Sequence, residues 1–336
     1  MKTMNPILAN AKKIALFRAL QLGDLLCAIP AIRALRAALP NAEITLLGLP
    51  WAKALIERFP QYLDNFIHFP GYMGLPEQPF DATEWHLFKE QIKERQFDVV
   101  LQMQGNGSYV NQMLETLDIK KLAGFHSVGN YMDEEWFMEY PNAGSEIDRH
   151  LLLMEHLGIP SKGRDLEFPI LEKDKAELHN LLLPLVDKKY VCVHPGSRGS
   201  WRQWPPACFA GLADFCIEKG YTVVITGTKE EALIVEEVLK CMKHAAIDIS
   251  GKTSLGAVGL LIKNACMLIS NCTGVAHVAS ALATPSIVIS MDGEPERWGP
   301  LNRKIHHVID WTQEKNYEHV FRILEQMLEK DSLLSV

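Results

Sequence analysis

Residues 270–285 read SNCTGVAHVASALATP, a polar start with one glycine followed by small residues. The preceding residues 265–269 form a short apolar run, and residues 286–291 are again β-branched and apolar, so both are expected strands. Between them a helix is expected to begin after the polar segment and to end before Pro285. A strand, a polar loop and a helix start direct unpaired N–H groups at one point, which favours a phosphate site. An ordinary strand–helix–strand unit capped by Thr273 has the same pattern.

The composition describes a globular protein with room for two domains. The chain has 336 residues, of which 48% are apolar and 22% charged. The formal net charge of −7 argues against a nucleic-acid-binding protein, which usually carries a basic excess. Seven dispersed cysteines form no CxxC pair, so we expect reduced thiols and a cytoplasmic protein rather than disulfides or a zinc site.

No segment is typical of insertion into a membrane. No run approaches the roughly 20 apolar residues of a spanning helix. Residues 1–13 lack the uninterrupted apolar core of a signal peptide. Any membrane contact is therefore expected to be peripheral.

Strand and helix patterns alternate on both sides of residues 160–189, where prolines and charges mix. The expected strands are residues 13–18, 43–48, 65–69, 97–103, 121–125, 190–194, 221–226, 246–249, 265–269 and 286–291. The expected helices end near Leu39, Phe59, Arg95, Leu117, Leu157, Lys219, Met242, Asn264, before Pro285, and near Lys330. This alternation predicts two α/β domains with parallel sheets, whose ligands bind at the carboxyl ends of strands. We expect one domain over residues 1–170, a second over 186–310, and a last helix within 311–336 that packs back on the first.

Three groups of segments resemble glycosyltransferase family 9, the heptosyltransferase family of lipopolysaccharide synthesis. The first is LGDL at 22–25 with PAIRAL at 30–35. The second is HPGS at 194–197 with RQWP at 202–205 and TG at 226–227. The third is SGKTSL at 250–255 with residues 270–285 and WGP at 298–300. Their order and spacing extend over nearly the whole chain.

The resemblance implies the GT-B fold, in which two Rossmann-like parallel-sheet domains face each other across a cleft. It implies an inverting, metal-independent glycosyltransferase that needs no cofactor. The first domain would bind a glycan or lipid-linked glycan acceptor such as the lipopolysaccharide core. The second would bind a nucleotide-sugar donor, a heptose or a related sugar linked to ADP. Such an acceptor implies a place in the cytoplasm, at the inner face of the cytoplasmic membrane.

Two residues are the catalytic candidates. Asp24 follows the first expected strand at a helix start, where aspartate is a frequent cap. The resemblance assigns the general base to this position, and an ordinary carboxyl pKa of about 4 would leave it ionised. Arg202 stands where the family usually has a lysine, and its planar guanidinium is expected to pair with the donor's diphosphate. A solvated loop charge is the alternative for Arg202.

The donor's phosphates are expected at the start of the helix after residue 273. Thr273, Gly274 and Val275 supply N–H groups there, and Ser197 adds a neutral donor. His277 lies in the first turn, where the helix dipole disfavours its charged form. His277 either donates to a phosphate as a neutral imidazole or is a hydrogen-bonded histidine of the core.

Cys272 departs from the family, which typically has aspartate before Thr-Gly or Ser-Gly at this place. A thiol is a weak acceptor, although a helix N-terminus can lower its pKa. A different donor, another carboxylate in this role, and reduced activity all remain open, and Cys272 also suits a small residue that only fills space. We hypothesise that the choice of donor has changed.

Other polar residues near expected strand ends are candidates for substrate contacts, and each also suits an ordinary role in a loop or helix cap. The possible nucleotide or sugar contacts are Glu230 with its neighbour Glu231, Lys252, and Glu294 with Asp292. The possible acceptor contacts are Gln104 and Asn106. No residues are expected to bind a metal.

Two other functions remain open at this point. A catalytically silent nucleotide-sugar-binding protein of the same fold is compatible with Cys272, and sugar transfer or donor hydrolysis would exclude it. A dinucleotide-dependent oxidoreductase would need the GxGxxG phosphate fingerprint, which residues 19–24, reading ALQLGD, lack.

Overall fold

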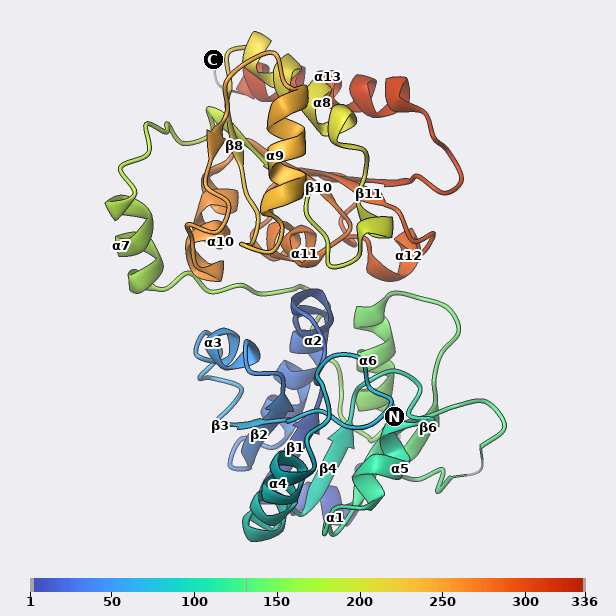
Figure 1. Cartoon of the computed structure of the whole chain (residues 1–336). Coiled ribbons are helices and arrows are strands. Elements are labelled where there is room, and N and C mark those ends of the chain that lie inside the picture. Colours follow the sequence, from blue (N-terminus) through green and yellow to red (C-terminus); the bar gives the residue numbers. More distant parts are fainter. Residues whose placement is uncertain (1–2, 131, 335–336) are drawn as a thin grey trace. The chain divides into compact units, whose positions relative to one another are not determined.

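The computed structural model describes residues 3–130 and 132–334 (Figure 1). The chain divides into two compact units, Met1–Asp165 and Leu166–Val336. Each unit contains one six-stranded sheet whose strands are all parallel, with helices packed against it. The predicted α/β class with parallel sheets is therefore confirmed.

The sheet of the first unit has the strand order β3-β2-β1-β4-β5-β6. Its strands are β1 Lys13–Phe17, β2 Glu43–Gly48, β3 Asn65–His68, β4 Val99–Gln102, β5 Leu122–His126 and β6 Phe137–Glu139. Its helices are α1 Pro6–Ala9, α2 Leu22–Ala38, α3 Ala52–Ile56, α4 Ala82–Arg95, α5 Val110–Glu115 and α6 Glu146–His156. The order reverses at β1, which pairs with β2 on one side and β4 on the other. The loops after β1 and β4 therefore meet at the carboxyl edge, where α/β sheets bind ligands.

The sheet of the second unit has the order β12-β11-β10-β7-β8-β9. Its strands are β7 Tyr190–His194, β8 Thr222–Ile225, β9 Ile247–Asp248, β10 Met267–Asn271, β11 Ser286–Ser290 and β12 His306–Asp310. Its helices are α7 Glu172–Asn180, η1 Ser200–Arg202, α8 Pro206–Glu218, α9 Ala232–Cys241, α10 Leu255–Asn264, α11 Gly274–Ala281, α12 Pro295–Trp298 and α13 Tyr317–Leu334. The order reverses at β7, which lies between β8 and β10. The loops after β7 and β10 therefore share the carboxyl edge of this sheet.

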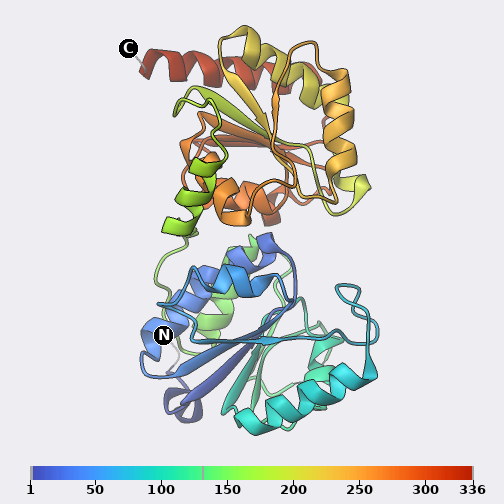
Figure 2. The same cartoon turned by 60° about the vertical axis from the view of Figure 1, so that its left-hand side comes forward.

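The last helix, α13, packs within the second unit. Val320, Leu324 and Leu328 recur at helical spacing and belong to the buried core cluster that contains Phe209 of α8. Figures 1 and 2 show α13 beside α8, with which it is in contact. The apolar face of this helix is therefore buried in its own unit, and the expectation that residues 311–336 pack back on the first domain stays a prediction.

The second unit begins before the expected boundary at residue 170. Phe168 lies so close to Gly259 of α10 that a Cβ there would be 2.3 Å from the ring. The helix α7, which the sequence did not predict, also packs against α10. Residues 166–185 therefore belong to the second unit, because Phe168 and α7 pack against α10.

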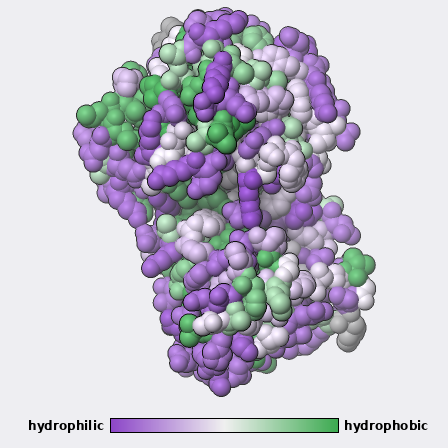
Figure 3. Space-filling view, in the orientation of Figure 1, coloured by the Kyte–Doolittle hydropathy of each residue, from purple (hydrophilic) through white to green (hydrophobic). Residues whose placement is uncertain are grey.

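A hydrophobic patch lies on the surface after α7. Residues 181–186 read LLLPLV, and Leu182 and Val186 expose 80% and 67% of their surface. Figure 3 shows this patch at the upper left of the view. A depression of about 440 Å³ beside it is lined mainly by leucines of this segment, α7 and α10. The segment is thus more apolar than its prolines and charges suggest.

The buried histidine at the start of β12 predicts how stability depends on pH. Nδ1 of His306 lies 2.8 Å from Oγ of Ser286. Burial, with smaller contributions from the charge of Arg303 and from His307, lowers the pKa of His306 to about 4. The unfolded chain takes up this proton near the ordinary pKa of about 6.5, before the folded chain does. Neutral His306 therefore supports full stability above about pH 6.5, and this contribution is lost as the pH falls from 6.5 to 4.

We expect the midpoint temperature of thermal unfolding to decrease as the pH is lowered from 6.5 to 4. The decrease should be smaller in His306→Gln, whose side chain takes up no proton. Differential scanning calorimetry across this range measures the change. His244→Gln is the control, because His244 is exposed and its Nε2 lies 3.4 Å from Oε1 of Glu218. If the dependence of the unfolding midpoint on pH became equally weaker in both variants, the assignment to His306 would be contradicted.

Candidate active site

The loop after β1 is built around the buried side chain of Arg18. Its Nε donates to the carbonyl oxygen of Asp24 at 2.7 Å, and its Nη1 donates to the carbonyl oxygen of Met103. Gln104 adds a second hydrogen bond between the loops, since its Oε1 accepts from the N–H of Ala19 at 2.8 Å. The loops after β1 and β4 are therefore hydrogen-bonded to each other at the carboxyl edge of the sheet.

Asp24 is the third residue of α2, and its carboxylate serves the helix start. Oδ2 accepts from the backbone N–H of Gln21 at 3.2 Å, and Oδ1 lies 3.7 Å from Nη2 of Arg18. The side chain keeps 22% of its surface exposed. Asp24 is thus a capping residue and at the same time an accessible carboxylate beside a buried guanidinium. The capping hydrogen bond orients the carboxylate without enclosing it.

Glu146 accompanies Arg18 in the interior, although the sequence does not single it out. Glu146 is the first residue of α6 and is buried. Its Oε1 accepts from Nη2 of Arg18 at 3.2 Å, and its Oε2 accepts from the hydroxyl of Tyr140 at 3.1 Å. Nη1 of Arg149 lies 3.6 Å from Oε2, and Nε2 of His150 lies 3.4 Å from Oε1. An acid in the first turn of a helix is common, so only the fold reveals this role.

The two predicted acceptor contacts both follow β4. Gln104 is buried and supports the loop through Ala19, as described above. Asn106 is exposed, and its Oδ1 accepts from the N–H of Ser108 at 3.1 Å, which is an Asx turn. The structure therefore uses Gln104 to hold the edge of the sheet and places Asn106 on the surface of the same loop.

In the second unit, Arg202 lies where three loops meet. Its Nη2 donates to the carbonyl oxygen of Cys272 at 3.4 Å and to Oδ2 of Asp292. These partners follow β10 and β11, whereas Arg202 follows β7. Its side chain is 31% exposed, so it is neither a solvated loop charge nor shut off from an anion. The guanidinium therefore sits at the carboxyl edge, next to the start of α11.

Thr273 is the N-cap residue of α11, with Gly274 and Val275 as the first helical residues. The N–H groups of such a helix start have no partners within the helix. The Oγ1 of Thr273 is buried and has no hydrogen-bond partner among the described residues. An unpaired buried hydroxyl is unfavourable, so this hydroxyl is suited to bind an oxygen of a ligand.

Cys272 and His277 both lie in the interior of this region. Cys272 belongs to a small buried cluster with Ala276 and Val288. Burial and the charge of Asp292 raise the pKa of Cys272 to about 12, although Arg202 has the opposite effect. The thiol is therefore neutral, and the helix N-terminus does not make it a thiolate. His277 is buried, and its ring meets Trp298 edge-on with centroids 6.5 Å apart, as a histidine of the core would.

Asn271 closes the loop that follows β7, although it was not among the predicted site residues. Its Nδ2 donates to the carbonyl oxygen of Pro195 at 2.7 Å, and its Oδ1 accepts from the N–H of Trp204 at 2.9 Å. Ser197 is buried within the closed loop, where its carbonyl oxygen accepts from Nε2 of Gln203 at 3.0 Å. Ser197 and α11 thus lie on neighbouring strand ends, as the sequence predicts for a shared edge.

Glu231 reaches the same loop, whereas Glu230 is exposed. Oε2 of Glu231 accepts from the N–H of Thr228 at 2.8 Å and lies 3.6 Å from Nε2 of His194. A Cβ on Gly196 would lie 2.2 Å from the carboxyl carbon of Glu231, so this carboxyl group lies directly against Gly196. Burial lowers the pKa of His194, and Glu231 opposes this effect. Of the two glutamates, Glu231 therefore has the position of a site residue.

Lys252 and Glu294 make local contacts. Nζ of Lys252 donates to the carbonyl oxygen of Asp248 at 2.7 Å, after the edge strand β9. β7 and β8 separate this strand from β10, so Lys252 is not brought to the start of α11. Glu294 accepts from Nη1 of Arg297 at 3.2 Å and from Nε1 of Trp298 at 3.3 Å, and so stabilises α12.

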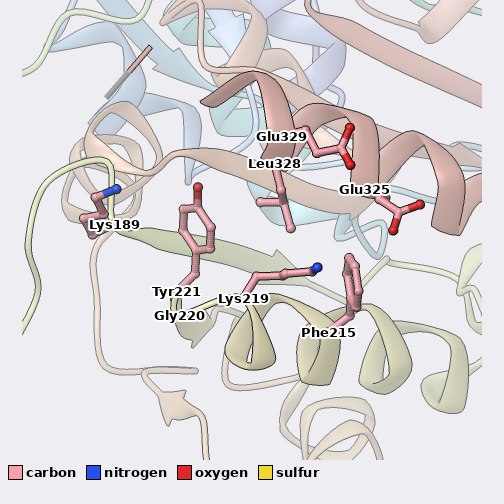
Figure 4. Close-up of a pocket in the computed structure, with 8 residues that line it drawn as sticks. All are labelled: Lys189, Phe215, Lys219, Gly220, Tyr221, Glu325, Leu328 and Glu329. Atoms are coloured by element: carbon pink, nitrogen blue, oxygen red, sulfur yellow. The ribbon is translucent and has the colours of Figure 1, made fainter. Parts of the chain in front are cut away.

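A depression of about 250 Å³ between α8 and α13 is separate from these residues (Figure 4). Lys189 and Tyr221, which line it, directly precede β7 and β8. It therefore lies at the amino edge of the sheet, opposite the edge that carries Arg202. Its lining contains both lysines and glutamates, so it favours neither an anionic nor a cationic ligand.

Two Rossmann-like units, each with polar residues at the carboxyl edge of its sheet, are the architecture of the GT-B fold. The crystal structure of a glycosyltransferase family 9 protein from Veillonella parvula aligns with a TM-score of 0.77 and 20% identity, covering 95% of this chain and 97% of that one. The Escherichia coli ADP-heptose lipopolysaccharide heptosyltransferase II aligns with a TM-score of 0.71 and 20% identity, covering 95% and 99%. These likenesses confirm the GT-B fold.

The sequence pattern of glycosyltransferase family 9 (heptosyltransferase) matches residues 85–326. The chain therefore belongs to this family and is a glycosyltransferase. Lipopolysaccharide heptosyltransferase 2 of Escherichia coli K12 is 22% identical over 297 residues, which cover 84% of this chain and 83% of that protein. Within residues 3–130 and 132–334, no helix combines the length and the apolar composition that crossing a membrane requires.

Proposed function

We propose that this glycosyltransferase is an inverting, metal-independent enzyme that transfers a heptose or a related sugar from a nucleoside-diphosphate donor to a glycan of the lipopolysaccharide-core type. The proposed donor site is supported by the residues at the carboxyl edge of the second sheet. Arg202 lies there beside the start of α11, and the buried hydroxyl of Thr273 has no partner among the described residues. A guanidinium, helix N–H groups and an unpaired hydroxyl together suit a diphosphate.

The reaction needs a base for the acceptor and positive groups for the leaving diphosphate. The acceptor's hydroxyl oxygen attacks the anomeric carbon from the face opposite the diphosphate, and Asp24 takes the hydroxyl proton. The bond from the anomeric carbon to the diphosphate oxygen breaks, and its electron pair stays on the diphosphate. Arg202 and the N–H groups at the start of α11 stabilise the negative charge that develops there. Configuration is therefore inverted in one step.

The rest of the donor is assigned to the loop after β7. The carboxylate of Glu231 against Gly196 is an acceptor for the hydroxyls of a ribose, and this replaces the weaker assignment to Glu230. An ADP moiety is supported by a relative of the same fold, the E. coli heptosyltransferase WaaC, whose structure was solved with ADP. That protein aligns with a TM-score of 0.69 and 17% identity. No further cofactor is proposed.

The acceptor is assigned to the first unit, where Asp24 is accessible. Asn106 is on the surface of the neighbouring loop and can bind acceptor hydroxyls. A lipid-linked acceptor would bring the enzyme to the inner face of the cytoplasmic membrane as a peripheral protein. The curated relative named lipopolysaccharide heptosyltransferase 2 supports this class of acceptor.

A thermal-shift screen over nucleotide-sugars, followed by a transfer assay, tests the proposal. An ADP-linked sugar at a hundred times its Kd would stabilise the folded protein by about 2.7 kcal/mol. Release of ADP that depends on a glycan acceptor would then show transfer. Stabilisation without any transfer or donor hydrolysis would instead favour the catalytically silent binding protein, to which the neutral thiol of Cys272 points. No stabilisation by any nucleoside-diphosphate sugar would overturn both.

Cys272 predicts an altered choice of donor. Its buried neutral thiol provides no carboxylate for a donor sugar beside the start of α11. We expect Cys272→Asp to change the ratio of kcat/KM between two ADP-linked sugars by about tenfold, or 1.4 kcal/mol. Cys272→Ser, which is similar in size and uncharged, is the control and should keep the original ratio. Unaltered turnover and preference in Cys272→Asp would show that this residue only fills space.

A further inference from the structure

Asp292 is a buried carboxylate held by its own loop. It lies two residues after β11, and only 8% of its side chain is exposed. Its Oδ1 accepts from Oγ of Ser290 at 2.8 Å and from the N–H of Glu294 at 3.3 Å. Two donors from the same loop therefore fix the orientation of this carboxylate. Its other oxygen, Oδ2, is directed at Arg202.

The guanidinium of Arg202 is placed by this carboxylate. Nη2 donates both to Oδ2 of Asp292 and to the carbonyl oxygen of Cys272 at 3.4 Å. On another side, the guanidinium lies 5.6 Å from the centroid of the Trp201 ring. An arginine side chain has several rotatable bonds, so an anchored counter-ion restricts it to one place. Here that place is beside the start of α11.

The same carboxylate also sets the charge that a diphosphate meets. Arg202 carries one positive charge, and Asp292 already neutralises it in the structure. A nucleoside diphosphate brings further negative charge to the same guanidinium. The nearby, largely buried carboxylate of Asp292 has the same sign and repels the diphosphate. Affinity for the diphosphate is therefore lower than the guanidinium alone would provide. This repulsion acts on the departing product, whose diphosphate carries more negative charge than the intact donor.

We propose that Asp292 is a positioning residue that holds Arg202 at the leaving group and, by its charge, promotes release of the nucleoside diphosphate product. The inference rests on the proposed function, because it takes the diphosphate to bind at Arg202. It assigns two separable roles to one side chain. The anchored geometry supports kcat, and the negative charge weakens the binding of the product.

Asp292→Asn separates the charge from the shape. We expect it to lower the Kd for ADP about tenfold, measured by isothermal titration calorimetry, and to lower kcat. The gain in affinity should shrink at high salt, because screening weakens the repulsion in the parent protein. Glu296→Gln is the matched control: it removes the same charge from a residue close by in the sequence whose side chain is 91% exposed and faces Arg303. Its affinity for ADP should equal that of the parent protein.

Ser290→Ala tests the positioning role without removing the charge. It deletes one of the donors that orient Asp292, so kcat should fall several-fold while the Kd for ADP stays unchanged. A purely structural role of the loop would instead lower the midpoint of thermal unfolding and weaken ADP binding in both variants.

Each outcome decides a different point. If the parent protein binds ADP and Asp292→Asn binds it equally or more weakly, the product-release role is overturned. If Glu296→Gln tightens binding as much, the effect is one of net charge and the assignment to Asp292 is overturned. If Ser290→Ala keeps full kcat, the positioning role is overturned. If the parent protein binds no ADP, the ADP site is overturned, and this proposal with it.

Discussion

An Asp24→Asn variant is expected to lose kcat by a factor of about 10²–10⁴, with KM for the donor little changed. Asparagine has nearly the same shape as aspartate but takes up no proton from the acceptor's hydroxyl. Its amide oxygen can still accept from the N–H of Gln21, which the carboxylate does now at 3.2 Å. The start of α2 should therefore remain capped, and the loss should come from chemistry and not from unfolding. Steady-state kinetics and the midpoint of thermal unfolding together measure the two effects.

The matched control is Asp81→Asn at the start of α4. Asp81 is another helix cap, and its Oδ1 accepts from the N–H groups of Thr83 and Glu84 at 2.8 and 2.9 Å. The control should keep full turnover, because Asp81 is an exposed cap of a different helix and has no proposed part in the reaction. If Asp24→Asn kept turnover within about threefold of the parent enzyme, Asp24 would be a cap alone and the general base would have to be another group.

A Glu146→Ala variant is expected to lose about 3–5 kcal/mol of the free energy of unfolding. Truncation removes the carboxylate that receives hydrogen bonds from Arg18 and Tyr140 at 3.2 and 3.1 Å. Arg18 would then remain buried with less compensation for its charge, and burying such a charge is costly. Urea denaturation followed by far-UV circular dichroism gives the change.

Glu155→Ala provides the comparison on the same helix. Glu155 is an exposed residue of α6, so its removal should cost no more than about 0.5 kcal/mol. Equal losses in the two variants would mean that Glu146 contributes only helix propensity. Since Arg18 also lies 3.7 Å from Asp24, any folded Glu146 variant should change turnover as well as stability.

The repeating pattern of each element was readable in the sequence because it is local. The strands 43–48 and 190–194 and the helix that ends at Asn264 have the predicted bounds, since apolar periodicity and caps lie within one short segment. The short strands β6 and β12 and the helix α7 were missed. β6 has three residues and β12 is rich in histidine, while α7 is almost entirely polar, so none carries a periodic apolar signal.

The candidate site was predicted in part, because the local pattern in the sequence shows which residues follow a strand. Asp24, Arg202 and Thr273 follow expected strands, and their places at carboxyl edges follow from the alternation of strands and helices. Glu231 rather than Glu230 reaches the loop after β7, because the close approach to Gly196 depends on the packing of α9. The support from Asn271 and from Glu146 was not predicted.

The alternation of apolar runs was enough to predict two parallel α/β units, a polar helix start at residues 273–275, and an acid and an arginine at strand ends. Which charges meet became known only from the folded chain. Arg18 pairs with Glu146, 128 positions away, and Arg202 pairs with Asp292, 90 positions away. The physical reason is that a parallel sheet brings the ends of distant strands to one edge, and no local pattern in the sequence records which loops share it.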